Sequence, residues 1–396
     1  MGAERGIAQG FKESETTGGA AMIYLDNSAS TRAFAQAAEA VEKYMLEDYF
    51  NPSASYAAAL PEEREFFRCR EVLSRTVDER RVYFTSGGTE GANTAVAGTL
   101  LSAARGAEQP EAVISEIEHP AVSQAALLLR KMGVKVLVAP VEPTGEIEPQ
   151  RVGEMVTPRT ALVSIMHVNN ETGVINDINA IAALVKAKNP DCIVHSDGVQ
   201  GHMRLETPSG TDIYTTSAHK VHGPKGMGVI AISKDIRIAP LIYGGGQQDD
   251  FRPGTLNMPG IAGYTRAIEV FKEEKILDKI SQIKIEYINL LSGIDGVYLI
   301  GKNTAPHIIC VAFEGVQAAS LQSALEARGV IVGKGSACSS RKNKVSPVLA
   351  AMKVPAKYAG GAIRISLGAF NTLEECSQTV GALEEALKYL RRFRRK

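Results

Sequence analysis

The chain has 396 residues, and its 44 lysine and arginine residues balance 44 aspartate and glutamate residues. This length predicts two domains of unequal size, and the balanced charge gives no sign of direct binding to DNA or to a membrane surface. No apolar run reaches the roughly 18 residues that a membrane-spanning helix requires. Residues 1–21 are polar and rich in glycine, so we expect either a disordered N-terminal extension or an upstream start, with Met22 as the alternative start.

The five cysteines are widely scattered and include no C-x-x-C pair. This argues against a disulfide framework or a structural zinc site, and it indicates a reducing, cytoplasmic location. No metal site is predicted. The cysteines are Cys69, Cys192, Cys310, Cys338 and Cys376.

Strand-like and helix-like segments alternate through the first two thirds of the chain. Strands are expected at 82–85, 112–115, 135–138, 161–166 and 192–196. Helices are expected from about Thr89, after Pro120 and over 178–188. This alternation predicts an α/β fold with a mostly parallel sheet covered on both faces, and ligands of such sheets bind at the carboxyl ends of the strands.

The pattern changes after about residue 275. A long charged helix is followed by strands, one further helix and a helix that closes the chain with 391–396, which predicts a smaller α+β domain. The strands are expected at 298–300, 307–313, 330–332 and 362–366, and the helix near 318–328.

Lys220 lies in a segment of small, polar and glycine residues, 215–226, just before an apolar run. A partly desolvated lysine has a lowered pKa, so it can act as a nucleophile and form a Schiff base with a carbonyl cofactor. Ser217 and His219 can donate hydrogen bonds to an anion. The alternative is a surface lysine in a glycine-rich loop, and only the other motifs of the chain argue against it.

Several further motifs follow expected strands. Glycines at a helix start in 85–93 are typical of phosphate binding, although many strand-to-helix turns contain them. Asp197 can hold a protonated ring nitrogen such as that of pyridoxal 5'-phosphate (PLP), with Gln200 in reach of the phenolic oxygen, or it caps a turn. His119 can stack on a flat cofactor and move protons, or it is a structural histidine. The amides in 166–173 can bond a cofactor oxygen or a substrate carboxylate.

Cys338 lies among glycine and serine residues in 333–340, which indicates an exposed and mobile thiol. Lys334 and Arg341 nearby favour the nucleophilic thiolate. The other four cysteines lie in apolar strand or helical segments and are expected to be structural. Arg364, within an expected strand, can clamp a carboxylate with two hydrogen bonds or form a salt bridge.

In this order, the motifs resemble those of the cysteine desulfurases (NifS/IscS-like) of the class V aminotransferase superfamily, which are fold type I PLP enzymes. The resemblance covers the chain from about Met22 to its C-terminus. It rests on Tyr24–Asn27, Asn51–Ser53, Thr85–Asn93, Glu118–His119, His167–Gly173, Asp197–Gln200, Ser217–Gly226, Gly244–Gln247, Arg252–Thr255, Gly335–Ser339 and Ile363–Gly368.

The resemblance implies the PLP-dependent transferase fold of aspartate aminotransferase. A large PLP-binding domain would span 33–275, and a small domain would combine 22–32 with 276–396 and carry the cysteine loop. It also implies a sulfurtransferase activity: L-cysteine becomes L-alanine, and sulfur passes to Cys338 as a persulfide. An acceptor protein of iron–sulfur cluster assembly or tRNA thiolation would then receive the sulfur.

The residue roles follow from the same resemblance. The catalytic residues would be Lys220, Cys338 and His119, and the substrate carboxylate would bind Asn170 and Arg364. The cofactor would be held within a homodimer, with Thr255 supplied by the other subunit. The implied cofactor-binding residues are Gly88, Thr89, His119, Asn170, Asp197, Gln200, Ser217, His219, Lys220 and Thr255.

Three positions depart from the family pattern. Ser55-Tyr56 stands where a histidine is usual, Arg32 where proline is frequent, and Lys334 where a small polar residue is usual. We expect these departures to affect the contacts at substrate entry and the pKa of the thiol in the loop, and not the binding of the cofactor. The alternatives are another class V enzyme, such as an aminotransferase or a selenocysteine lyase, and a non-catalytic sulfur carrier or scaffold homologue.

Overall fold

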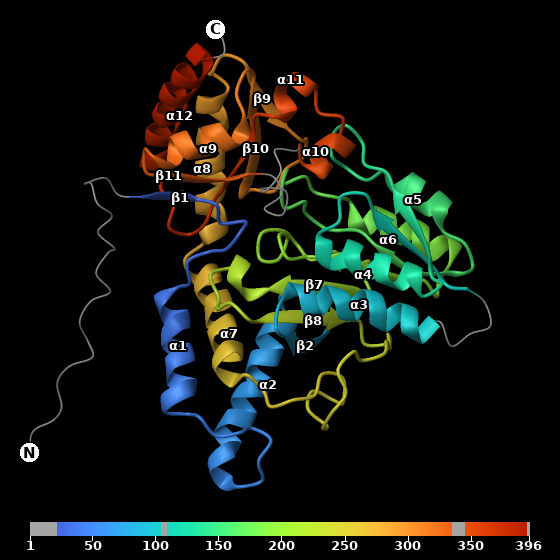
Figure 1. Ribbon diagram of the computed structural model, residues 1–396. Coiled ribbons are helices and arrows are strands. Elements are labelled where there is room, and N and C mark those ends of the chain that lie inside the picture. Colours follow the sequence, from blue (N-terminus) through green and yellow to red (C-terminus); the bar gives the residue numbers. More distant parts are fainter. Residues whose placement is uncertain (1–21, 104–108, 335–344, 394–396) are drawn as a thin grey trace, which may run out of the picture.

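The computed structural model describes residues 22–103, 109–334 and 345–393, which form two β-sheets with helices packed against them (Figure 1). The larger sheet has the strand order β2-β8-β7-β6-β5-β3-β4. Neighbouring strands from β7 to β4 are parallel, whereas β8 runs antiparallel to both β7 and β2. Its strands are β2 (Arg81–Thr85), β3 (Glu111–Ser115), β4 (Lys135–Ala139), β5 (Thr160–Ser164), β6 (Ile193–Asp197), β7 (Ile213–Ser217) and β8 (Gly228–Ile232).

Alternate residues of the central strands face opposite layers of helices, because side chains alternate across a strand. In β8, Val229 and Ala231 pack with α2 and α7, whereas Ile230 and Ile232 pack in a cluster with Ala95 of α3. Both faces are therefore apolar and covered, as in other largely parallel sheets. The helices around this sheet are α1 (Ala35–Leu46), α2 (Leu60–Ser74), α3 (Gly88–Ala103), α4 (Pro120–Lys131), α5 (Pro149–Met155), α6 (Ile178–Lys188) and α7 (Met258–Glu273), with 3-10 turns η1 (Ala57–Ala59) and η2 (Ala218–Lys220).

The smaller sheet has the order β1-β11-β12-β10-β9, in which only β1 and β11 are parallel. One apolar cluster joins its strands to α8 and α12, which lie side by side in Figure 1. The strands are β1 (Ile23–Leu25), β9 (Val297–Ile300), β10 (Ile308–Phe313), β11 (Val330–Lys334) and β12 (Ala362–Ser366). The helices are α8 (Ile276–Leu291), α9 (Ala318–Glu326), α10 (Pro347–Ala351), α11 (Ala356–Ala359) and α12 (Glu374–Phe393).

The segment after β1 leads from the smaller sheet to the larger one. It runs beside the turn that carries Lys220, because the Thr31 amide donates to the carbonyl of His219 at 2.9 Å and the Phe34 amide donates to the carbonyl of His222 at 3.0 Å. The segment after β1 thus places its main-chain groups next to the end of β7. This contact is central to the site described below.

The predicted α/β fold with a mostly parallel sheet is confirmed. Strand β5 ends at Ser164, two residues earlier than expected, and β7 was not predicted. The N-terminal β1 lies in the sheet of the C-terminal strands. The division into a large domain of 33–275 and a small domain of 22–32 with 276–396 stays a prediction. Residues 1–21 lie outside the described residues.

No helix in the described ranges is both long enough and apolar enough to cross a membrane.

Gly198, directly after β6, provides a test of how tightly this sheet edge is packed. A Cβ added there would lie 1.9 Å from a ring carbon of Tyr214. We therefore expect Gly198→Ala to lower the free energy of unfolding by about 3 kcal/mol or more, since the buried ring must shift. Denaturant unfolding followed by circular dichroism measures this effect.

Gly381 in α12 is the matched control, because a Cβ there meets nothing within 4 Å. Gly381→Ala is expected to raise stability by roughly 0.5–1 kcal/mol, since alanine is the better helix former. Equal effects of the two substitutions would contradict the packing described at Gly198.

Candidate active site

A cavity of about 280 Å³ opens at the carboxyl ends of β6 and β7, close to the lower limit of ordinary ligand pockets. All of the cofactor-binding residues predicted from the sequence line it, except Thr255. Such an edge is where ligands bind in open α/β sheets. The lining residues are Ser28, Gly88, Thr89, His119, Met166, Val168, Asn170, Asp197, Val199, Gln200, Ser217, His219 and Lys220.

Lys220 lies in the short turn after β7, with its amine inside this cavity. Its Nζ donates hydrogen bonds to the main-chain carbonyls of Ser28 and Ala29, both at 2.7 Å. Burial lowers the pKa of this amine to about 8, and the positive charges of Arg364 and Arg204 add to the effect. About a tenth of the amine is therefore unprotonated at pH 7, far more than for an ordinary lysine, and the unprotonated form is the one that acts as a nucleophile or base.

Asp197 ends β6 and is only 6% exposed. Its Oδ1 accepts a hydrogen bond from the amide of Val199 at 3.0 Å. Burial raises the pKa of this carboxyl, while His119 and Lys220 oppose the rise. Within the described ranges no salt bridge engages Asp197, so this buried carboxylate fits a cationic ring nitrogen brought in by a ligand.

His119 is the N-cap of α4, and its Nδ1 accepts a hydrogen bond from the amide of Ala121 at 3.1 Å. The ring proton of the neutral form is therefore on Nε2. The preceding Glu118 is buried, and its Oε1 accepts from Ser115 Oγ at 2.5 Å and from the amide of Met166 at 2.8 Å. Glu118 thus ties the ends of β3 and β5 together and fixes the backbone that holds His119.

The start of α3 forms the anion-binding side of the cavity. A Cβ at Gly88 would lie 2.7 Å from Val199 Cγ2, so only glycine allows this close approach. Gly88 and Thr89 open a 16-residue helix whose first amides have no partner within the helix, and Ser217 lies opposite at the end of β7. Amides of this kind bind phosphate.

His219 lines the same cavity, and its Nδ1 lies 3.2 Å from Ser30 Oγ. Burial lowers the pKa of His219 to about 4, helped by the charges of Lys220 and Lys225, so the ring is neutral near pH 7. The Ser28 hydroxyl oxygen is buried and has no hydrogen-bond partner in the described structure. This hydroxyl is an unused polar group at the wall of the cavity.

Gln200 is held between the two sheets. Its Nε2 donates to the carbonyl of Ser28 at 3.0 Å, and its Oε1 lies 3.1 Å from Nε2 of His307. His307 is fully buried, and burial holds its pKa well below the usual range. A neutral imidazole that donates to Oε1 fixes the orientation of the amide, whose NH₂ group then donates to the carbonyl of Ser28 and has a second N–H to offer.

Arg364 of β12 and Asn170, which sequence analysis paired as carboxylate ligands, lie in contact. Arg364 Nη1 donates to the carbonyl of Asn170 at 2.6 Å, and Nη2 donates to Asp26 Oδ1 at 2.5 Å. The Nε atom is buried without a partner among the described residues. A Cβ at Gly333 would lie 2.9 Å from Arg364 Nη2, so the strand that leads into the cysteine loop passes directly over the guanidinium.

Two predicted site residues in the described ranges, Arg364 and Thr255, are not among those that line this cavity. Thr255 is exposed and does not line the cavity of its own chain, and Cys338 lies outside the described residues. Sequence reasoning also missed some of the lining. Those residues are Ser28 and Met166, each next to a recognised motif, and Val168 and Val199, each inside one.

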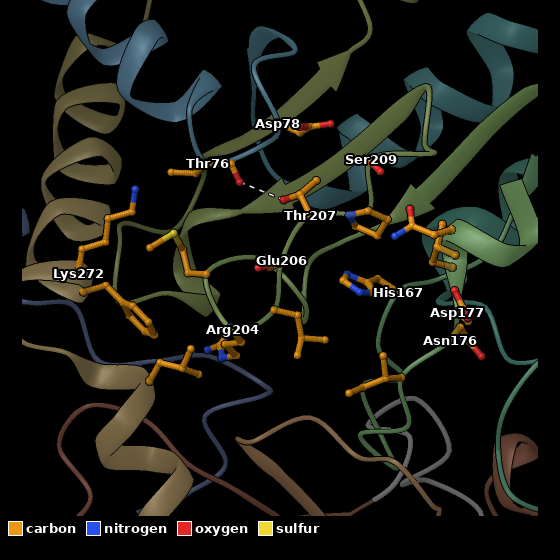
Figure 2. Close-up of a pocket in the computed structure, with 18 of the residues that line it drawn as sticks. Thr76, Asp78, His167, Asn176, Asp177, Arg204, Glu206, Thr207, Ser209 and Lys272 are labelled. Atoms are coloured by element: carbon orange, nitrogen blue, oxygen red, sulfur yellow. Dashed lines mark hydrogen bonds between the residues drawn. The ribbon is translucent and has the colours of Figure 1, made fainter. Parts of the chain in front are cut away.

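The described structure also contains a second cavity, of about 1110 Å³ (Figure 2). The two cavities share the extended segment after β5: Met166, Val168 and Asn170 face the smaller one, while His167 faces the larger. Arg204 also lines the larger cavity and is labelled with His167 in Figure 2. Lys220, Asp197 and His119 all belong to the smaller cavity, which is therefore the candidate active site.

Glu118 makes stability depend on pH. Burial raises the pKa of its carboxyl to about 8, above the ordinary value of 4.5. Its neutral form therefore contributes stability below about pH 4.5, and this contribution is lost as pH rises toward 8. We expect Glu118→Gln to become more stable relative to wild type between pH 5 and pH 8.5, by up to about 3 kcal/mol. Thermal unfolding at several pH values measures the difference.

The exposed Glu116 in the same turn is the control for this prediction. Glu116→Gln should follow the wild-type curve at every pH. Parallel curves for Glu118→Gln and wild type would show that Glu118 does not titrate as described.

Comparisons with known proteins agree with this geometry. Residues 23–378 match the family model of aminotransferase class-V. The chain is 34% identical over 379 residues to a "Cysteine desulfurase IscS" from Dictyoglomus turgidum, with 93% of this chain and 95% of the relative covered.

Solved structures give the same result. A structure titled "NIFS-LIKE PROTEIN" superposes with a TM-score of 0.86 and 31% identity, covering 93% of this chain and all of the other. A structure titled "SspA in complex with cysteine" gives a TM-score of 0.76 and 28% identity, covering 88% of this chain and all of the other. The chain therefore belongs to the class V aminotransferase family of PLP enzymes, as a homologue of the cysteine desulfurases.

Proposed function

We propose that this protein converts L-cysteine to L-alanine with bound PLP and transfers the sulfur atom through Cys338 to an acceptor. The observation that carries the proposal is a single cavity that holds a lysine of lowered pKa and a buried carboxylate, Lys220 and Asp197. The buried Asp197, the glycine-lined start of α3 and the unpartnered Ser28 hydroxyl fit the ring nitrogen, phosphate and other polar groups of PLP.

The residues around the cavity have distinct tasks in this proposal. Asp197 would pair with the pyridine nitrogen, His119 would stack on the ring, and Gln200 would donate to the phenolic oxygen. Gly88, Thr89, Ser217 and His219 would hold the phosphate. When bound, PLP supplies the electron sink that makes a substrate proton removable.

Lys220 is the residue that would move the substrate α-proton, because its amine is partly unprotonated and close to the ligand space. Arg364 would bind the substrate carboxylate together with Asn170. The Asp26 carboxylate and the Asn170 carbonyl each accept one N–H group of the guanidinium, so its orientation is fixed before substrate arrives.

Cys338 would attack the sulfur of the bound substrate as a thiolate. A new S–S bond forms, the Cβ–S bond breaks, and its electron pair stays with the carbon fragment, which takes up protons to become alanine. The place of β11 supports this step: Gly333 pairs with Arg364 in the sheet, so the strand that precedes Cys338 in the sequence ends beside the proposed carboxylate site. Cys338 is four positions after Lys334 in the sequence, a distance that the chain spans with at most about 14 Å.

A homodimer would complete the site through Thr255, which is exposed in the single chain. The preceding Arg252 is fixed by an ion pair with Glu90 at 2.9 Å, so the segment has a defined place. Exposed apolar side chains on and around α1 and α2 support a subunit interface. They are Met45, Leu46, Tyr49, Tyr56, Leu60 and Phe67. The acceptor would be a protein of iron–sulfur cluster assembly or tRNA thiolation.

The role of Lys220 has a direct test. Lys220→Ala should lose the visible absorbance of lysine-bound PLP and reduce alanine formation by roughly 10²–10⁴-fold, since the proton-moving amine is absent. Absorbance spectra and an alanine assay measure both effects. Lys225→Ala, at an exposed position in the same loop, is the control and should behave as wild type; a wild-type spectrum for the Lys220 variant would refute the assignment.

The role of Cys338 requires a different readout. Cys338→Ser should keep the PLP spectrum of wild type but form no protein-bound persulfide, because a serine hydroxyl cannot accept sulfur in this way. Persulfide labelling after incubation with L-cysteine measures this. Ser339→Ala is the control within the loop, and full persulfide formation by the Cys338 variant would assign the reaction to another thiol.

A further inference from the structure

Arg204 joins the turn after β6 to the turn after β7. Its side chain is 3% exposed, and its Nη2 donates a hydrogen bond to the main-chain carbonyl of Lys220. The residue also lines the larger cavity, where it is labelled in Figure 2. The catalytic lysine is thus held through its own backbone by an arginine four residues after Gln200.

The guanidinium of Arg204 is a buried charge without a counter-ion. In the part of the chain that the structure describes, no carboxylate pairs with it, and its Nε and Nη1 atoms are buried without a partner. Burial lowers its pKa only to about 10, so the charge is kept at neutral pH. The ionisable groups that it faces are phenols of raised pKa and imidazoles of lowered pKa, namely Tyr214, Tyr264, His202, His222 and His307.

The backbone that carries Arg204 is also strained. Met203 has φ 64°, a left-handed conformation that is uncommon for a residue with a side chain. The turn is closed by the amides of Arg204 and Leu205, which both donate to the carbonyl of Gly201 at 3.0 Å. A buried unpaired charge and a strained residue side by side are costly for stability, and such costs concentrate at functional sites.

We propose that Arg204 is a positioning residue for the PLP reaction. Its guanidinium fixes the carbonyl of Lys220 and keeps a permanent positive charge behind the lysine nitrogen, which disfavours protonation of that nitrogen. This inference rests on the proposed function, because it concerns Lys220 in the PLP-loaded protein. The other charged or titratable groups around the lysine are Arg364, Asp26, Asp197 and His219.

The experiment is a pH titration of the visible absorption band of the PLP-loaded protein. Removal of a nearby positive charge makes the protonated lysine nitrogen easier to form, so its titration midpoint must rise. We expect Arg204→Met and Arg204→Gln to raise the midpoint by roughly one pH unit. Glutamine keeps a donor for the Lys220 carbonyl and thereby separates the effect of charge from that of the hydrogen bond. Arg204→Lys keeps the charge and is expected at the wild-type midpoint.

Arg80 provides a matched control. It is 4% exposed and donates to the carbonyls of Val77 at 2.9 Å and Pro208 at 2.9 Å, away from Lys220. Arg80→Met therefore removes an equally buried guanidinium and should lower thermal stability without a change in the midpoint. Circular dichroism checks the fold of every variant.

The outcomes separate this inference from the proposed function. Wild-type protein that shows no pH-dependent visible band with added PLP would refute the proposed function. A wild-type band together with unshifted midpoints in Arg204→Met and Arg204→Gln would refute the role of Arg204 alone. A shifted midpoint in Arg204→Lys would also refute the role of Arg204, and so would a shift in Arg80→Met equal to that in Arg204→Met. If the uncharged variants do not fold, the midpoint of Arg204→Lys is the test of the role of Arg204.

Discussion

Removal of the Lys220 amine from bulk water is the constraint on which the site depends. The amine exchanges water for two main-chain carbonyls, those of Ser28 and Ala29, and burial lowers its pKa to about 8. Those carbonyls are in place because β1 pairs with β11 and the chain then runs beside the turn of Lys220. The pairing of β1 with β11 in the smaller sheet therefore determines the surroundings of the lysine amine at the end of β7 in the larger sheet.

The two sheets meet at the cavity through polar contacts rather than through apolar packing alone. His307, just before β10, contacts Gln200, and Arg364 of β12 bonds both Asp26 and the carbonyl of Asn170. Each contact joins a residue of the C-terminal part to one near the cavity. Buried polar networks of this kind are strong only when most partners are in place, so they fix a single relative arrangement of the two sheets.

Much of the fold and of the site could be predicted from local sequence patterns. Asp197 and His119 each follow an apolar strand run, and Gly88 lies in a strand-to-helix turn. Because the carboxyl ends of parallel strands lie at the same edge of a sheet, the sequence predicts that these residues lie near one another. By contrast, β7 was missed because Tyr214–Ser217 is mostly polar, although both of its faces are buried. Its hydroxyl groups find partners inside the protein, such as Tyr264 for Thr216 at 2.8 Å.

Other parts of the site could not have been predicted from pattern. The groups that hold Lys220 are carbonyls, which no side-chain pattern indicates. Arg204 and His307 reach the site through contacts that span 16 and 107 residues of sequence. Tertiary structure alone brings such partners together, and a single sequence contains no signal for them.

The most direct measurement is borohydride reduction of the protein after incubation with PLP, followed by peptide mapping with mass spectrometry. Reduction makes the link between an amine and PLP permanent, so the modified lysine can be identified. We expect the pyridoxyl group on Lys220, the amine that burial leaves partly unprotonated. Modification of a different lysine instead, or of none, would contradict the assignment of this cavity as a PLP site.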